Sequence, residues 1–169
     1  MKKLLLTVVL VIAVVAAVVF AAREPTIARW DRQIGDDPLI VIADSDSSQA
    51  YAGAMLLSQL KRDAYIKTMS EVTGYYQDTI LVMTCGAGDL TQFGIDIDDC
   101  NSLDDNQGII KVMMVNGNDI LLVTGKTGFD VRRAANFLRY NKQAVKQIRT
   151  DEAYITGTTF SDIVVEQVG

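Results

Sequence analysis

The fold is decided by residues 108–141, GIIKVMMVNGNDILLVTGKTGFDVRRAANFLRYN. Two apolar runs, residues 109–115 and 120–124, flank a polar tetrapeptide that begins with Asn116-Gly117. An Asn-Gly pair between apolar runs favours a type I′ turn, because both residues tolerate the positive φ angles that this turn requires. The pattern therefore predicts a β-hairpin.

A helical pattern follows the second apolar run, which stops at Gly125. Thr127 can cap this helix, and Asp130, three residues later, takes the place of the Glu or Gln that usually completes a capping box. Apolar residues at helical spacing form one face and polar residues form the other: Val131, Ala134, Ala135 and Leu138 against Arg132, Arg133, Asn136 and Arg139. The stretch predicts a hairpin, a short turn and an amphipathic helix.

Gly125-Lys126-Thr127 stands between this strand and this helix, where the phosphate-binding loop of many nucleotide-binding proteins lies. The full motif also needs a glycine five residues earlier, and the residue there is Ile120. A lone anion could bind at the helix N-terminus. The sequence nevertheless favours a tight turn and a helix cap over nucleotide binding.

The chain before the hairpin has the pattern strand, helix, strand. Residues 39–43 are an apolar run, residues 44–48 are a polar turn that can cap a helix over residues 48–61, and residues 64–69 form a second strand. This βαβ unit predicts a right-handed crossover and a parallel strand pair.

Further strands are expected at residues 79–84, 154–156 and 163–168, the last of them at an edge of the sheet. We therefore expect an α/β fold. It has a small mixed, partly parallel sheet with a βαβ unit, an Asn-Gly hairpin and two main helices, and an N-terminal hydrophobic helix precedes it.

The N-terminus predicts export. Lys2 and Lys3 precede residues 4–22, which are 19 residues without a charge. This run is longer than a signal-peptide core of about 7–15 residues and close to the roughly 20 residues that span a membrane. Residues 1–22 are therefore a signal peptide or a transmembrane anchor. The two lysines favour an inside N-terminus, so the rest of the chain is expected at the cell surface, membrane-anchored or secreted, and facing outside.

Residues 23–37 are mainly polar and are interpreted as a juxtamembrane spacer, with residues 38–169 as the exported domain. The spacer contains the single tryptophan of the chain, Trp30. This side chain would either lie at the membrane interface or pack on the domain.

Composition limits the possible functions. The chain has 16 Lys and Arg against 21 Asp and Glu, a formal net charge of −5, and no histidine. An acidic chain without a long basic run argues against nucleic-acid binding, because neutralising phosphates needs clustered Lys or Arg. Lack of histidine removes the usual general base and the commonest metal ligand. We expect no catalytic residues, no cofactor and no assigned metal site.

Cys85 and Cys100 are the only cysteines. In an exported domain they are candidates for a disulfide, which the chain-entropy model values at about 3 kcal/mol for a loop of this length. Two free thiols are the alternative.

Five residues in the turns after two strands are candidates for ligand binding: Asp44, Asp46, Ser47, Gly86 and Gly88. The turns of residues 44–48, 85–89 and 125–128 are expected to meet at one edge of a parallel sheet. Carboxylates there, or in the acidic loop of residues 94–107, could bind Ca²⁺ through oxygen atoms. Neither segment matches an EF-hand loop, so a solvated acidic loop is the simpler interpretation.

The order of several short motifs resembles the C-terminal region of archaeal S-layer and S-layer-like cell-surface proteins. The matching segments are residues 108–111, 116–117, 121–125 and 130–135, preceded by Asp44, Ser70-Glu71-Val72 and residues 81–86, and followed by residues 155–158 and 163–165. The resemblance covers most of residues 38–168.

This resemblance implies a non-enzymatic envelope protein with a structural or adhesive role. Its expected partners are other envelope or S-layer proteins or a second copy of the chain, together with the membrane through residues 4–22, and no nucleic acid. The alternative is a membrane-tethered module that binds Ca²⁺ or a small ligand at the strand-end turns.

Overall fold

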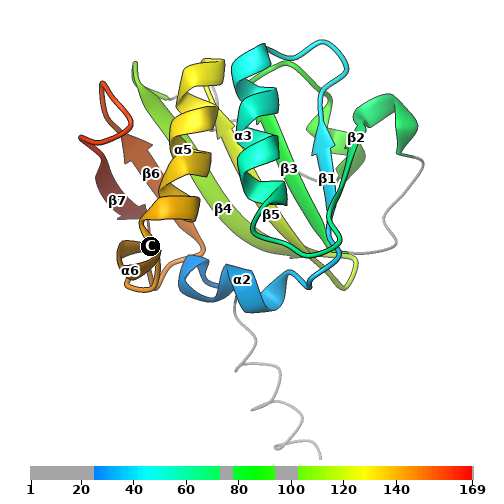
Figure 1. The fold of residues 1–169 in the computed structure, drawn as a ribbon, viewed down its shortest axis with the longest axis horizontal. Coiled ribbons are helices and arrows are strands. Elements are labelled where there is room, and N and C mark those ends of the chain that lie inside the picture. The colour runs from blue at the N-terminus through cyan, green and yellow to red at the C-terminus, as the bar shows by residue number, and fades with distance from the viewer. Residues whose placement is uncertain (1–24, 73–77, 94–102, 169) are drawn as a thin grey trace, which may run out of the picture.

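The computed structural model describes residues 25–72, 78–93 and 103–168, and within them it is an α/β fold with one mixed sheet (Figure 1). The strands are β1 (Leu39–Ile42), β2 (Tyr65–Thr68), β3 (Thr79–Thr84), β4 (Gln107–Val115), β5 (Asn118–Gly125), β6 (Glu152–Thr156) and β7 (Val164–Val168). The described part has seven strands, in the order β2-β1-β3-β5-β4-β6-β7.

The helices lie mainly on one face of this sheet (Figure 1). They are α2 (Trp30–Gln33), α3 (Ser48–Ser58), α5 (Gly128–Tyr140) and α6 (Lys142–Val145), with short 3₁₀ turns η1 (Ile27–Arg29), η2 (Met69–Glu71) and η3 (Leu90–Phe93). The two main helices, α3 and α5, pack side by side across the sheet.

The predicted βαβ unit is present. β1 pairs in parallel with β2, and Leu39 stands opposite Tyr65. β1 also pairs in parallel with β3, which in turn pairs in parallel with β5. Four neighbouring strands therefore point the same way, and their carboxyl ends meet at one edge of the sheet.

The predicted hairpin is confirmed. β4 and β5 are antiparallel, and Val115 stands opposite Asn118. Asn116 has φ of 53° and Gly117 has φ of 85°, the positive angles of a type I′ turn. The second strand of the hairpin lies next to β3, so β4, β6 and β7 extend the parallel half of the sheet with an antiparallel half.

The predicted cap of α5 is also confirmed, because the Thr127 hydroxyl and the Asp130 carboxylate form a capping box. The helix packs closely on α3 at Gly53, where an added Cβ would lie 3.4 Å from the Cβ of Ala135. Small residues at this crossing bring the two helices near enough to bury one continuous core against the sheet.

The prediction that Arg133 lies on the exposed polar face of α5 is wrong, because this residue is only 4% exposed. Its guanidinium lies 2.7 Å from the carboxylate of Asp130 and donates to the carbonyls of Asn106 and Thr159. The loops that precede β4 and follow β6 cover this side of the helix, so an arginine placed at a polar helical position becomes an internal ion pair.

The segment interpreted as a spacer packs into the domain from Ile27 onward. Ile27 and Ile34 are fully buried and Trp30 is 3% exposed. The Ile27 amide donates to the carbonyl of Thr150, and Lys61 donates to the carbonyls of Asp31 and Ile34 at the end of α2. Of the two alternatives for Trp30, the structure shows the packed one.

The predicted hydrophobic helix of residues 1–22 lies outside the described residues. In the part of the chain that the structure describes, no helix is both long enough and apolar enough to cross a membrane.

Candidate functional site

The three strand-end turns meet at the carboxyl edge of the parallel strands, as the sequence predicts. The turn after β1 contacts the end of β3 through Asp46, whose carboxylate accepts hydrogen bonds from the amide of Thr84 at 2.7 Å and from its hydroxyl at 2.8 Å. The turn after β3 contacts the end of β5, because the Cys85 amide donates to the carbonyl of Gly125 at 2.9 Å.

Ser47 connects the first turn to both helices. Its hydroxyl accepts a hydrogen bond from the Ala50 amide at 3.1 Å and so caps α3. The same hydroxyl fills the space over Gly128 at the start of α5, where any added Cβ would overlap it. Ser47, which the sequence predicts as a ligand-binding residue, therefore caps α3 and packs between the N-termini of α3 and α5.

Asp44 connects the end of β1 to the end of β2. Its carboxylate accepts hydrogen bonds from the hydroxyl and the amide of Ser70. The hydroxyl bond from Ser70 is the main reason that the pKa of Asp44 lies below its usual value. The group is exposed to solvent and ionised, and its acceptor positions are already partly occupied by the protein.

The two predicted glycines shape the turn after β3. Gly86 has φ of 78°, which favours a residue without a Cβ. Gly88 packs directly on the side chain of Met69, and an added Cβ would overlap the sulfur atom. All five predicted residues thus lie at one edge, and each has a role in connecting or shaping the turns.

The described residues do not form a metal site at this edge. Among residues 25–72, 78–93 and 103–168, no group of three or more Asp, Glu or Cys side chains is arranged to hold a metal ion. Part of the predicted acidic loop, residues 94–102, lies outside the described residues. Asp105, in the described part of that loop, pairs with Lys126 at 3.0 Å.

The glycine-lysine-threonine turn has the predicted local structure. The amide and hydroxyl of Thr127 both donate to Asp130, at 2.9 and 2.7 Å. Both donors of Thr127 are therefore paired with the Asp130 carboxylate in the first turn of α5. A nucleotide phosphate at this position would need free donors instead.

Cys85 lies at the same edge, with its sulfur 3.5 Å from the hydroxyl of Thr124. Cys100 lies outside the described residues, so the bridge between the two cysteines stays a prediction.

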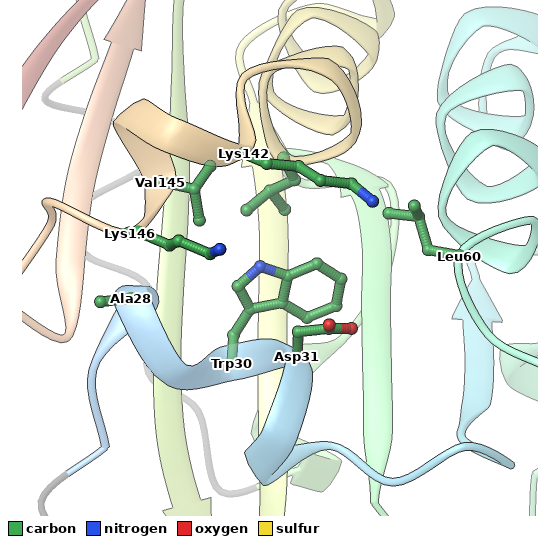
Figure 2. A pocket seen from close by; sticks show the side chains of 8 residues that line it. Ala28, Trp30, Asp31, Leu60, Lys142, Val145 and Lys146 are labelled. Carbon is green, nitrogen blue, oxygen red and sulfur yellow. The ribbon is translucent and has the colours of Figure 1, made fainter.

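The opposite end of the domain has a cavity of about 110 Å³ between α2 and α6 (Figure 2). Its walls come from four parts of the chain: Ala28, Trp30, Asp31, Leu60, Leu138, Lys142, Val145 and Lys146. Sequence reasoning singled out Trp30 but missed the two lysines. They follow the predicted helix of the hairpin stretch in a segment without a distinctive motif, and only the fold brings them over the tryptophan.

No protein-family model matches this chain, and no curated protein matches its sequence.

Proposed function

We propose that the protein is a non-catalytic envelope protein, tethered to the membrane through residues 4–22, with a structural or adhesive role at the cell surface. Its partners are other envelope or S-layer-like proteins, or a second copy of the chain. The observation that supports this proposal is the carboxyl edge of the sheet. Open α/β sheets usually bind small ligands at this edge, and here Asp44, Asp46 and Ser47 hold the turns together instead.

A rigid edge of this kind suits a protein that presents a fixed surface to partners. β7 offers one such surface, because it ends the sheet and pairs with β6 alone among the described strands. One row of its backbone donors and acceptors therefore points away from the sheet and can pair with an added strand. Val164 on this strand is 66% exposed, which gives a partner an apolar contact beside the backbone.

Photo-crosslinking in intact envelopes tests this role. A photoreactive residue at position 164 of the full chain should give a discrete crosslinked species of higher mass, identified by mass spectrometry as an envelope protein or a second copy. Position 114 is the matched control, because Met114 is also exposed, at 46%, but lies on the interior strand β4. Equal products from both positions, or none from position 164, would contradict contact through β7.

A calcium titration tests the alternative function. A ligand that binds only the folded state raises the Tm, and a concentration of 100 times its Kd adds about 2.7 kcal/mol. We expect no change of Tm in millimolar Ca²⁺, because the protein's own donors occupy the carboxylates at the edge. A rise in Tm that Asp44→Asn abolishes would replace the structural role with ion binding at the strand-end turns.

A further inference from the structure

We propose that the cavity between α2 and α6 binds the phosphate group of an anionic membrane lipid. The proposal deepens the proposed function, since it rests on the membrane tether and names a second contact between the domain and the bilayer. Two observations support the proposal. Hydrogen-bond donors line the cavity, and the cavity lies close along the chain to the apolar N-terminal run.

The first donor is the indole N–H of Trp30. The residue is 97% buried, since its exposure is 3%, and Figure 2 shows the nitrogen edge of the ring turned into the cavity. Among the described residues, no acceptor receives a hydrogen bond from this N–H. The nitrogen atom is open to the cavity, because Arg132 Nε is the one fully buried side-chain nitrogen or oxygen atom without a partner among the described residues. This donor is therefore available to a ligand in the cavity.

Lys142 and Lys146 supply two further donors. Both are exposed side chains of the α6 segment, and Figure 2 shows their ammonium groups extending over the indole of Trp30. Neither forms an ion pair with a carboxylate of the described residues. The neighbouring Asp31 does not neutralise them, because its carboxylate lies 3.0 Å from the ammonium of Lys61.

These donors define the chemistry of the ligand. One indole N–H and two ammonium groups face one space, and a phosphate supplies several charged oxygen acceptors for them. The cavity of about 110 Å³ is several times the roughly 10–15 Å³ that one water needs on the same measure. It has room for a phosphate group, whereas the acyl chains of a lipid would remain outside the domain.

The position of the cavity favours a lipid as the source of this phosphate. Ala28 lines the cavity and follows the end of the apolar run, Ala22, by six residues. Six residues span at most about 20 Å, so a tether that ends at the membrane surface keeps the cavity close to the headgroups. The exposed side chains of Arg29, Arg32 and Arg149 add positive charge to the same segments, although the chain as a whole is acidic.

The single tryptophan allows a direct measurement, because all indole fluorescence comes from Trp30. The full chain in non-ionic detergent micelles is titrated with short-chain phosphatidylglycerol, with short-chain phosphatidylcholine and with inorganic phosphate. We expect a saturable fluorescence change with phosphatidylglycerol, and at least tenfold weaker binding of the other two. No change with phosphatidylglycerol would overturn the site, and equal or tighter binding of inorganic phosphate would overturn the lipid as its occupant.

Two double variants test the named side chains. Lys142→Gln with Lys146→Gln should raise the Kd for phosphatidylglycerol at least tenfold. Lys67→Gln with Lys126→Gln removes the same charge from exposed lysines away from the cavity and should leave the Kd unchanged. Equal weakening by both pairs would show a general charge effect and contradict the site.

The membrane tether is tested separately by washing membranes with alkaline carbonate. Release of the full chain by this wash would contradict the tether of the proposed function. The micelle titration reports on the lipid site whether or not the tether holds, so failure of one and failure of the other are distinguishable.

Discussion

Replacing Arg133 by methionine should destabilise the domain more than any exposed charge replacement. The guanidinium is 4% exposed and its partner Asp130 is 2% exposed, with 2.7 Å between the paired atoms. Removing one member of a buried ion pair costs about 3–5 kcal/mol, because the other charge stays buried without compensation. The substitution also removes a hydrogen bond to the carbonyl of Thr159 and one of the two hydrogen bonds to the carbonyl of Asn106, which keeps the Gly157 amide as a donor. The free energy of unfolding of a single domain is only about 5–15 kcal/mol. A large part of the stability of this domain therefore depends on the pair.

Urea unfolding followed by circular dichroism measures the effect. With a slope of about 2 kcal/mol per molar urea, a loss of about 4 kcal/mol lowers the midpoint by roughly 2 M. The control is Lys126→Gln, which breaks the pair with Asp105. The two side chains of that pair are 52% and 88% exposed, and such surface pairs contribute about 0–1 kcal/mol.

A second variant separates the buried charge from lost packing. Adding Asp130→Asn to Arg133→Met removes the uncompensated carboxylate and should recover part of the lost stability. Equal midpoints for Arg133→Met and Lys126→Gln would refute the importance of the buried pair. A double variant less stable than Arg133→Met would show that the carboxylate at position 130 acts mainly through the helix cap.

Three further predictions follow from local contacts. Gly128→Ala should cost about 1–3 kcal/mol in urea unfolding, because the new Cβ overlaps the Ser47 hydroxyl. The pKa of Asp162 is lowered by hydrogen bonds from the hydroxyls of Thr158 and then Thr159. Its contribution is therefore complete above the unfolded pKa of about 3.9 and declines as the pH falls below it, and Asp162→Asn should flatten the loss of Tm in acid. The predicted disulfide implies that a thiol reagent labels neither cysteine until a reductant is added, and that reduction then lowers the Tm; labelling of the folded chain without reductant would contradict the bridge.

Much of the fold could be predicted because its signals are local. Three features each depend on a few neighbouring residues, and the structure has all three. They are the Asn116-Gly117 turn, the Thr127 cap and the third strand over residues 79–84. The helix predicted over residues 48–61 ends earlier, at Ser58. The residue at the end of the predicted range, Lys61, instead donates to the end of α2, a contact between segments that no helical pattern contains.

The parts that could not be predicted depend on contacts between distant segments. Arg133 is internal because two of its acceptors are carbonyls in distant loops, one 27 residues before it and one 26 residues after it. The cavity near Trp30 requires α2 and α6 to meet, although more than a hundred residues separate them in the sequence. For the strand-end turns, the sequence predicted correctly where the residues lie. It could not show that their donors and acceptors are satisfied within the chain.

Hydrogen bonds between carboxylates and hydroxyls give the acidic residues of the turns a structural role in this histidine-free chain. In each case a Ser or Thr donates its hydroxyl to a nearby carboxylate: Asp44 with Ser70, Asp46 with Thr84, Glu71 with Thr68, Asp89 with Thr91, Asp130 with Thr127, and Asp162 with Thr158 and Thr159. In each of these pairs the carboxylate also accepts at least one backbone amide in the same region, so one acidic side chain satisfies several turn donors at once. An ion that bound these carboxylates would have to displace those donors. The acidic residues of the turns are therefore better explained as structure than as a binding site. The two lysines beside Trp30, which form no ion pair with a described carboxylate, are the more informative charges.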